Sequence, residues 1–434
     1  MRCLWLEPVR RLAGRVALPY SKSVTNRQLS LGAHTLRSFR LKGISEGSDS
    51  QYLLKALAKV GYTARPEGEA WAFIPPANFP AAVSLYLGEG GTTLRFLVPW
   101  LAHLPLQAEV AVAPTLARRP IAPLLSALRQ AGFTLSETFP LRIEGRPDLQ
   151  PKYFGLDASL SSQFLSALFL AAPWLPEGAT IELKNRRLAT PAYAEATRQL
   201  VAAYGWLWQE DNGRWTLQPA TQPTELEFVG EADWSAGGYF FGWAALGAFR
   251  GWLPLRPSSL QPESQLFLSL PLPYRWRWEA EGLWLESTEG PVPPMNLSVE
   301  NCPDALLVLA VVAAFAEGPS QFQGVYTLPH KESHRLAALA AELAKVGARL
   351  DWDRETLRVF PAASLPKQLL LFSAWGDHRI AMALSLLAAR LDYPIGIVGA
   401  DCVAKSFPTY WAVLKELGAS LKFDACDAKT GGAP

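Results

Sequence analysis

The stretch LLKALAKVGYTARPEGEAWAF, residues 53–73, decides the fold because a similar stretch recurs along the chain. Its first half is a Leu- and Ala-rich helical pattern that stops at Gly61, a residue that ends helices because it adopts left-handed backbone without a Cβ clash. Its second half alternates apolar and polar residues, which predicts a strand and a hairpin with one buried face. The same pattern returns at 124–145, 198–219, 336–360 and 410–424.

The spacing of these copies predicts six repeats. Their glycines are separated by 71, 73, 142 and 71 residues, at Gly61, Gly132, Gly205, Gly347 and Gly418. The long gap is twice the short one, so a further copy is expected near Trp276, where prolines replace the helix stop but the hairpin pattern remains. Six such units favour an α/β protein of two domains with three units each over one domain with accidental periodicity.

Domain boundaries follow less directly. Gly230 is a plausible hinge, and a pairing of the N-terminal strand with the second half would make the chain cross near Pro19 and again near Gly230. The expected domains are 20–231, and 1–19 together with 232–434. Each repeat has room for a second helix, and 94–104, 163–175 and 304–316 are apolar all round, which predicts core helices.

Composition excludes several classes of protein. The 434 residues are 49% hydrophobic and 18% charged, so the chain is not dominantly disordered. With 41 Lys+Arg against 39 Asp+Glu it lacks the basic excess of a nucleic-acid binder. No apolar run reaches the ~18 residues of a membrane span. The four cysteines lie far apart, without metal-ligand spacing, which favours reduced thiols in the cytoplasm.

Cations and hydroxyls stand repeatedly at the starts of predicted helices, where the macrodipole is positive. Each motif alone is explained equally well by a helix cap or a solvated charge. Arg118 and Arg119 are expected in the first turn of a helix, and Lys331 and Arg335 on one helix face. The motifs are SKSVTNR (21–27), LGEGGTTLR (87–95), ARRP (117–120), DASLSSQF (157–164), PDALL (303–307), PHKESHR (329–335), WGDHRIAMALSL (375–386) and CVAKSFPTY (402–410).

Together the motifs predict a site for a multiply anionic substrate, provided that both domains turn these helix ends toward one cleft. Asp304 and Glu332 are the acids available among the cations, and they are candidates for base and acid. Neither a metal-ligand cluster nor a nucleotide motif is visible, so no metal and no cofactor are expected.

These motifs, in this order, resemble the 5-enolpyruvylshikimate-3-phosphate synthase family from LPYSKS to AKSFPTYW. The resemblance implies two domains, each of three βαβαββ units closed as an inside-out barrel, with a double hinge crossing. It implies transfer of the enolpyruvyl group of phosphoenolpyruvate to the 5-hydroxyl of shikimate 3-phosphate, with release of phosphate. Small-molecule substrates are implied as partners and a monomer is expected, while the charge balance and the short apolar runs argue against nucleic acid and membrane as partners.

The resemblance also implies site residues. Asp304 would accept the hydroxyl proton, Lys331 would polarise that hydroxyl, and Glu332 would exchange a proton with the methylene carbon. Lys22 is implied to be catalytic and to contact both substrates. The shikimate 3-phosphate site would comprise Lys22, Ser23, Arg27, Ser161, Ser162, Gln163, Thr190, Tyr193, Asp304, Thr327 and Lys331. The phosphoenolpyruvate site would comprise Lys22, Gly91, Arg119, Gln163, Arg335, Arg379 and Lys405.

The chain departs from the family pattern at Tyr20, Glu89, Gly90, Thr327 and His334. Glu89 matters most, because a carboxylate near an anion site repels the anion unless Arg or Lys pairs with it. The departures keep open an alternative, a non-catalytic anion-binding member of the same fold.

Two other enzymes compete with this interpretation. The related UDP-N-acetylglucosamine enolpyruvyl transferases usually carry a reactive cysteine before the Arg-Pro motif, and VAPTLARRP has none. An RNA-end-processing enzyme on similar repeats would need a basic stripe and its own catalytic histidine pattern, and both are absent from the sequence.

Overall fold

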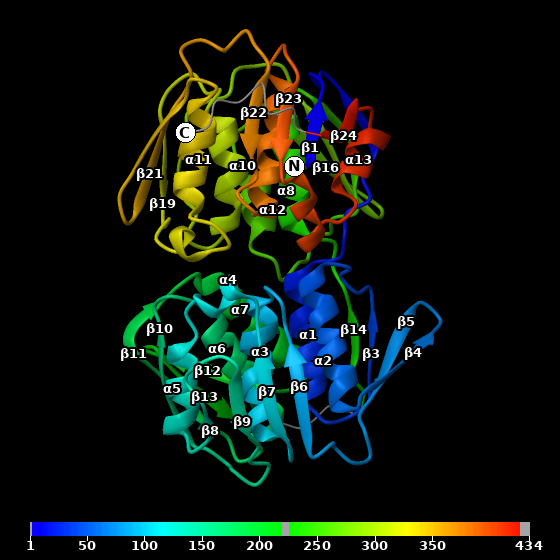
Figure 1. The fold of residues 1–434 in the computed structure, drawn as a ribbon, viewed down its shortest axis with the longest axis vertical. Helices are drawn as coiled ribbons and strands as arrows, with labels where there is room; N and C mark the ends of the chain where they lie inside the picture. Colours follow the sequence, from blue (N-terminus) through cyan, green and yellow to red (C-terminus); the bar gives the residue numbers. More distant parts are fainter. Residues whose placement is uncertain (1, 219–224, 426–434) are drawn as a thin grey trace. The chain divides into compact units, whose positions relative to one another are not determined.

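The chain divides into two compact units in the computed structural model, which describes residues 2–218 and 225–425. Unit 1 comprises Met1–Pro19 and Ala232–Pro434, and unit 2 comprises Tyr20–Glu231 (Figure 1). Each unit contains three four-stranded sheets. The two units are described separately below.

Unit 2 repeats one arrangement three times: a pair of parallel strands, two helices, and an antiparallel hairpin whose second strand pairs with the parallel pair. A helix joins the two parallel strands in the second and third repeats, whereas in the first repeat the strand β14 comes from the far end of the segment. The first repeat is β14 (Glu227–Val229), α1 (Lys22–His34), β3 (Phe39–Lys42), α2 (Ser48–Val60), β4 (Thr63–Glu67) and β5 (Ala70–Ile74). The second is β6 (Ala82–Tyr86), α3 (Gly91–His103), β7 (Gln107–Ala111), α4 (Pro114–Ala117), α5 (Ala122–Gln130), β8 (Thr134–Leu135) and β9 (Leu141–Glu144). The third is β10 (Tyr153–Ala158), α6 (Gln163–Leu170), η1 (Ala172–Trp174), β11 (Thr180–Leu188), α7 (Pro191–Ala203), β12 (Leu207–Asp211) and β13 (Arg214–Gln218).

Unit 1 is built in the same way. Its first repeat is β2 (Leu12–Arg15), α8 (Trp234–Ala245), β15 (Phe249–Leu253), α9 (Glu263–Ser269), β16 (Tyr274–Glu279) and β17 (Gly282–Ser287). The second is β18 (Asn296–Ser298), η2 (Pro303–Ala305), α10 (Leu306–Ala313), β19 (Ser320–Gln323), η3 (Leu328–His330), α11 (Arg335–Ala344), β20 (Arg349–Trp352) and β21 (Thr356–Phe360). The third is β22 (Leu370–Ser373), α12 (His378–Ser385), η4 (Leu386–Ala389), β23 (Ile395–Val398), η5 (Ala400–Lys405), α13 (Tyr410–Glu416), β24 (Leu421–Ala425) and β1 (Arg2–Leu6).

Strands that are distant in sequence complete one sheet in unit 2 and two sheets in unit 1, where β2 pairs parallel with β15. The N-terminal strand β1 lies between β23 and β24 and pairs antiparallel with both. In unit 2, β14 pairs parallel with β3, so the end of the segment completes its first repeat. The unit boundaries at Tyr20 and Ala232 therefore lie between strands that belong to different sheets.

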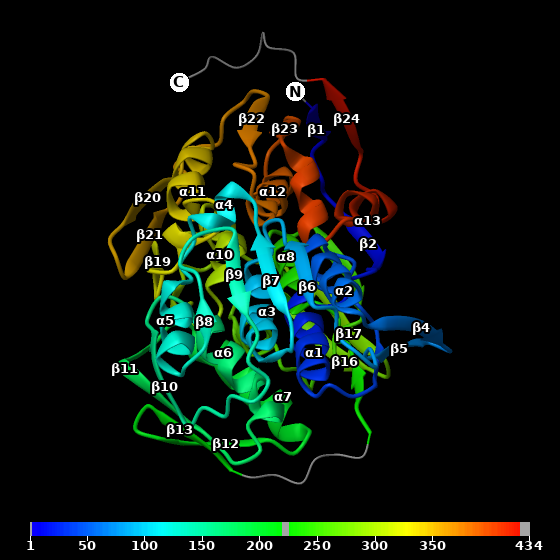
Figure 2. The same ribbon diagram turned by 60° about the horizontal axis from the view of Figure 1, so that its bottom comes forward.

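The predicted helix stops are confirmed. Every repeat glycine has a positive φ, between 89° and 112°, just after the helix of its repeat, namely Gly61, Gly132, Gly205, Gly347 and Gly418. In the repeat without such a glycine, α9 ends at Ser269 before Leu270 and Pro271, and the β16–β17 hairpin still forms. The six-fold pattern is therefore a structural repeat. Figures 1 and 2 both show β4 and β5 as a hairpin that extends away from the helices of unit 2.

Three helices form the centre of each unit, and side chains bury them on almost all faces. In unit 1 these are α8, α10 and α12, and in unit 2 they are α1, α3 and α6, which run side by side (Figure 1). The predicted core helices at 94–104, 163–175 and 304–316 are α3, α6 and α10.

The central helix α1 is rich in polar residues, so its composition alone does not predict that it is buried. Asn26 and Gln28 are buried because each has a partner: Asn26 Nδ2 donates to Thr93 Oγ1 at 3.3 Å, and Gln28 Nε2 donates to the Val229 carbonyl at 2.8 Å. Buried polar groups are tolerated when they are hydrogen-bonded. The polar face of α1 therefore joins α3 and β14 to one core.

No helix in residues 2–218 and 225–425 is long and apolar enough to span a membrane. Cys3, Cys302 and Cys402 are free thiols, and Cys426 lies outside the described residues.

Unit 2 is expected to lose stability in mild acid because of a buried stack of aromatic rings. Trp174 Nε1 donates to His34 Nδ1 at 2.7 Å, and the Trp174 ring stacks on His103 with centroids 4.5 Å apart. Burial lowers the pKa of His34 to about 3 and that of His103 to about 4. Both histidines take up a proton more readily when the chain is unfolded, so stability is full above pH ~6.5 and falls as pH drops toward the folded pKa values.

The variant His34→Gln tests this expectation, since a glutamine oxygen still accepts from Trp174 and does not titrate. The unfolding free energy is obtained from urea curves between pH 7 and pH 4.5. It should fall with decreasing pH less steeply for the variant than for the parent. The two slopes should differ by about 1.4 kcal/mol per pH unit, because one titrating proton has been removed. Parallel pH curves for the two proteins would contradict the assignment.

Candidate active site

Unit 1 brings three helix starts to one arginine. Asp304 lies in η2 immediately before α10, Arg335 is the first residue of α11, and Asp377 is the N-cap of α12, where its carboxylate accepts from the Arg379 backbone N–H. A carboxylate at this position satisfies free N–H groups of the helix start. The sequence singled out all three motifs, and the structure brings them together.

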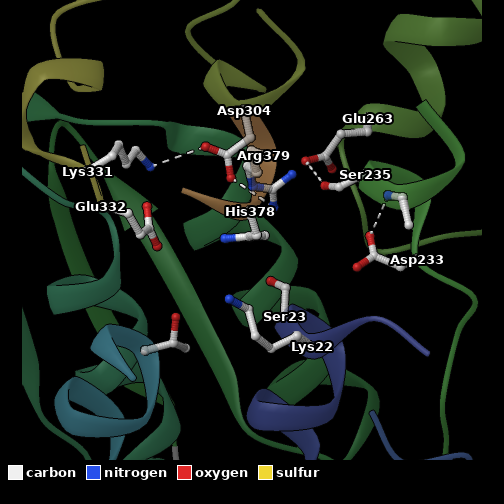
Figure 3. A network of polar contacts seen from close by, with 12 residues as sticks. Lys22, Ser23, Asp233, Ser235, Glu263, Asp304, Lys331, Glu332, His378 and Arg379 are labelled. Carbon is white, nitrogen blue, oxygen red and sulfur yellow. Dashed lines mark hydrogen bonds and ion pairs between the residues drawn. The ribbon is translucent and has the colours of Figure 1, made fainter. Parts of the chain in front are cut away.

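The Arg335 side chain is 1% exposed and binds three carboxylates (Figure 3 shows Asp304 and Glu332). Its Nε donates to Asp377 Oδ2 at 2.8 Å, its Nη1 donates to Asp304 Oδ1 at 2.5 Å, and its Nη2 donates to Glu332 Oε2 at 3.0 Å. Ser333 Oγ also donates to Asp377 Oδ2, at 3.2 Å. A guanidinium suits this arrangement because its five N–H donors lie in one plane.

More cations surround the same acids. Arg379 Nη2 lies 3.0 Å from Asp304 Oδ2, Lys331 Nζ lies 3.7 Å from Asp304 Oδ1, and Lys405 Nζ lies 3.3 Å from Glu332 Oε1. The acid–cation cluster is defined here as Asp304, Glu332, Asp377, Lys331, Arg335, Arg379 and Lys405. It has four cations against three carboxylates, so one positive charge remains to attract an anion.

Burial alone would raise the pKa of Asp304, but Arg379, Lys331 and Arg335 outweigh it and hold that pKa well below its usual range. Burial would likewise lower the pKa of Arg335, and Asp377, Asp304 and Glu332 instead raise it above its usual range. Asp304 is therefore a firmly ionised carboxylate in the cluster, and it becomes a better base only when cations move away from it.

One local prediction for this region is wrong. Lys331 and Arg335 do not share a helix face, because Lys331 has extended backbone after η3 and α11 begins only at Arg335. The two residues still meet through Asp304. Thr327 is buried just before η3, and within the described residues its hydroxyl has no hydrogen-bond partner.

The start of α8 adds acids that the sequence did not single out. Asp233 is the N-cap and accepts from the Ala236 N–H at 3.2 Å, and Ser235 Oγ donates to Glu263 Oε1 at 2.8 Å (Figure 3). An aspartate directly before an apolar helix was the available signal for Asp233. No comparable signal marks Glu263, which is buried on α9.

In unit 2, the N-terminal turns of five helices contact one another. Lys22 Nζ at the start of α1 donates to Asp49 Oδ2 at 2.9 Å in the first turn of α2, and the Asp49 carbonyl accepts from Thr93 Oγ1 of α3 at 2.8 Å. Aligned helix starts concentrate positive potential, and a buried carboxylate compensates it. The sequence analysis missed Asp49, although an acid in the first turn of a helix is a recognisable signal.

Arg27 links α1 to α7. Its Nε donates to Thr197 Oγ1 at 2.7 Å, its Nη2 donates to the Tyr193 carbonyl at 3.0 Å, and its Nη1 donates to the Ser23 hydroxyl at 2.5 Å. The guanidinium also lies 5.9 Å from the centroid of the Tyr193 ring. Arg27 therefore brings Ser23 and Tyr193 together, and it does so largely as a buried structural cation.

Gly91 and Gln163 begin α3 and α6, where two arginines meet them. A Cβ on Gly91 would lie 3.1 Å from Arg119 Nη1 and 3.2 Å from Arg95 Nη1. Gln163 accepts from Arg95 and donates to Thr92 Oγ1 at 3.1 Å. A side chain at position 91 would therefore push the Arg119 guanidinium back from the helix start by a few tenths of an ångström.

The expected placement of the arginine pair is wrong. Arg118 is the C-cap of α4, and the next helix, α5, begins at Ala122, so Arg118 and Arg119 lie between two helices and not in a first turn. The sequence ARRPIAP, residues 117–123, has Pro120 outside α5, because the helix start is set by the second proline, Pro123.

The hydroxyls predicted at the start of α6 meet the start of α7. Ser162 Oγ and Thr190 Oγ1 are 2.8 Å apart, and the Ser161 hydroxyl accepts from the Gln163 N–H at 3.3 Å. Thr190 has φ +46° and ψ +63°. Left-handed backbone is unfavourable for a β-branched residue, and such strain clusters at functional sites.

Glu89, which departs from the family pattern in the glycine-rich turn, accepts a hydrogen bond from Thr115 Oγ1 at 2.7 Å and is half-buried. Thr115 belongs to α4, so this bond ties the glycine-rich turn to the segment that leads to Arg119.

Comparison with solved structures identifies the architecture. The EPSP synthase from Acinetobacter baumannii aligns over 98% of this chain and 100% of its own, with a TM-score of 0.78 at 21% identity. The enolpyruvyl transferase NikO from Streptomyces tendae aligns over 98% of this chain and 99% of its own, with a TM-score of 0.75 at 17% identity. The fold is therefore the repeated βαβ fold of the enolpyruvyl transferases.

Sequence comparison narrows this class to one family. The family model for EPSP synthase (3-phosphoshikimate 1-carboxyvinyltransferase) matches residues 6–414. The 3-phosphoshikimate 1-carboxyvinyltransferase of Photobacterium profundum is 32% identical over 96% of this chain and 99% of its own length, and that of Aeromonas salmonicida is 31% identical over 95% and 98%. The chain belongs to the EPSP synthase family and is a carboxyvinyltransferase.

Proposed function

We propose that this chain transfers the enolpyruvyl group of phosphoenolpyruvate to the 5-hydroxyl of shikimate 3-phosphate in the shikimate pathway, and that the two units divide the work. Unit 2 would bind the shikimate phosphate through Lys22, Ser23, Arg27, Ser161, Ser162, Gln163, Thr190 and Tyr193. Unit 1 would supply acid, base and most of the cations for phosphoenolpyruvate. The observation that carries the proposal is the acid–cation cluster, in which Arg335 alone binds three carboxylates.

Binding of phosphoenolpyruvate would change the state of this cluster. The substrate brings a carboxylate and a phosphate, which compete with Asp304 for Arg379 and with Glu332 for Lys405. Cations that turn toward the substrate stop stabilising ionised Asp304, so its pKa rises. Substrate binding would thereby convert an inert carboxylate into a base for the 5-hydroxyl.

In the proposed reaction, the hydroxyl oxygen forms a bond to C2 of phosphoenolpyruvate while its proton goes to Asp304 and Glu332 protonates the methylene carbon. Glu332 then takes a proton back from that carbon as the C–O bond to phosphate breaks, and the phosphate leaves with the bonding electron pair and the proton that Asp304 had accepted. Lys331 would polarise the 5-hydroxyl of shikimate 3-phosphate. The buried Thr327 hydroxyl would form a hydrogen bond with the same substrate. Lys22, Gly91, Arg119, Gln163, Arg335, Arg379 and Lys405 would compensate the charge of phosphoenolpyruvate.

Phosphate release in the presence of both substrates tests the proposal. Turnover that requires both substrates would support it. Binding of shikimate 3-phosphate without any phosphate release would instead support a non-catalytic anion-binding member. A monomer in the cytoplasm that needs no metal or other cofactor stays a prediction from the sequence.

The variant Gly91→Ala tests the position of the phosphoenolpyruvate site in unit 2. The new methyl group would lie 3.1 Å from Arg119 Nη1, and that flexible side chain would give way at little cost in stability. We expect the KM for phosphoenolpyruvate to rise about tenfold, equivalent to ~1.4 kcal/mol, with the thermal midpoint unchanged.

The matched control is Gly318→Ala, since a Cβ there has no atom closer than 3.8 Å and φ is not left-handed. If the two variants had the same KM for phosphoenolpyruvate, the proposal that Gly91 and Arg119 belong to the phosphoenolpyruvate site would be wrong.

A further inference from the structure

Helix α11 holds the segment that carries Arg379 at two points. Arg335 binds Asp377 at the start of α12, as described above. Glu342 lies seven residues later on the same face of α11 and binds the turn that precedes Asp377. Its Oε2 accepts from the Ser373 N–H at 3.0 Å, and its Oε1 accepts from Trp375 Nε1 at 2.9 Å.

Glu342 is 2% exposed, so its charge is costly to bury without partners. Lys345 Nζ lies 2.7 Å from Oε2, and the two N–H donors of the turn complete its hydrogen bonds. A helix position that needed only an apolar contact would be filled at less cost by leucine. The presence of a buried carboxylate at position 342 is therefore explained by its hydrogen bonds to the turn at Ser373 and Trp375.

That turn is strained. Trp375 has φ +54° and Gly376 has φ +67°, two consecutive left-handed residues of which only one is glycine. A non-glycine residue in this region costs about 1–3 kcal/mol and persists only when its surroundings hold it. Trp375 is 49% exposed, so packing against the core holds it only in part. Its backbone N–H donates to Ser373 Oγ at 3.2 Å inside the turn, and its indole N–H donates to Glu342, which ties the turn to α11.

We propose that Glu342, acting through the indole N–H of Trp375, is a positioning residue for the carboxyvinyl transfer. It holds the left-handed turn at Trp375 and Gly376, and this turn sets Asp377 as the N-cap of α12 and Arg379 against Asp304. This inference rests on the proposed role of Arg379 in binding phosphoenolpyruvate. Glu342 is not among the residues proposed to contact either substrate, and its partners are Ser373, Trp375 and Lys345.

The variant Trp375→Phe tests the inference, because phenylalanine keeps an aromatic ring and cannot donate to Glu342. The matched control is Trp71→Phe, on β5 of unit 2, where the tryptophan is 44% exposed. For Trp375→Phe we expect the KM for phosphoenolpyruvate to rise about tenfold, with the KM for shikimate 3-phosphate and the thermal midpoint as in the control.

A second variant, Glu342→Gln, keeps one acceptor oxygen but turns an amide N–H toward one of the two donors, so it should raise the same KM. Values for Trp375→Phe equal to those of Trp71→Phe would overturn the inference. So would a loss of kcat together with a lower thermal midpoint and unchanged KM values, which would indicate a merely structural role.

The variant Arg379→Met separates this inference from the function on which it rests. A raised KM for phosphoenolpyruvate in Arg379→Met, with Trp375→Phe like its control, would refute only the positioning role. An unchanged KM in Arg379→Met would refute the proposed role of Arg379, and the positioning inference would fall with it.

Discussion

Glu332→Gln is expected to lower kcat for phosphate release by about 10²–10⁴-fold, the usual contribution of a general acid–base group. Glutamine has nearly the same shape, and its carbonyl oxygen still accepts from Arg335 Nη2, which lies 3.0 Å from Glu332 Oε2. It cannot carry a proton to the methylene carbon or take one back. The loss should therefore appear in kcat, while binding of shikimate 3-phosphate stays within about twofold of the parent value.

Glu317→Gln is a suitable control, because Glu317 is an exposed acid in the same unit. It should leave both kcat and the KM values unchanged. Retention of more than a tenth of the parent kcat by Glu332→Gln would contradict the assigned role. It would also make Asp304 the main proton-transfer group of the reaction.

Arg335→Met is expected to destabilise the protein by about 3–5 kcal/mol, the cost of removing one partner from a buried ion pair. Methionine fills much of the volume but leaves Asp377, which is 0% exposed, and Asp304 without their shared cation. Urea unfolding at pH 7 should show the loss as a lower midpoint.

The difference in unfolding free energy between the parent and Arg335→Met should become smaller as pH falls. In the parent protein, Asp304 has a lowered pKa, so its contribution is present above pH ~3.8 and fades as pH drops further. In Arg335→Met one of the cations that lower the pKa of Asp304 is gone, so Asp304 takes up a proton more readily, and the protonated acid no longer needs the missing cation. The difference between the two proteins should therefore be largest near neutral pH and smaller near pH 4.

Arg358→Met is the matched control for this variant. Arg358 is exposed on β21 and donates to Gln321 Oε1 at 3.1 Å, so its loss should change stability by less than about 0.5 kcal/mol. If Arg335→Met unfolded at the same urea concentration as this control, the acid–cation cluster would contribute no net stability.

Much of the fold could be predicted because its signals are local. A glycine after a helical pattern has a left-handed backbone wherever it occurs, and Gly61, Gly132 and Gly347 all do so here. The starts of α1 and α12 were equally visible, since a capping residue and the helix that it caps are neighbours in sequence. Arg118 and Lys331 were misplaced because a proline or a four-residue spacing is compatible with more than one local structure.

Partners in the site could not be predicted in this way. Lys22 meets Asp49, 27 residues away, and Arg335 meets Asp377, 42 residues away, across different helices. Glu342 meets Trp375 in the next repeat. Nothing in the local pattern distinguishes these side chains from solvated charges, and Thr190 shows no sign in sequence of its left-handed backbone.

The sequence by itself therefore determined the repeat, the helix ends and the residues with chemical potential, since each depends on backbone preferences within a few residues. Tertiary structure alone decided which acid neutralises which cation. Strand pairing and helix packing select one set of contacts among many, and burial then gives those contacts the strength to hold Asp304 ionised and Arg335 fixed.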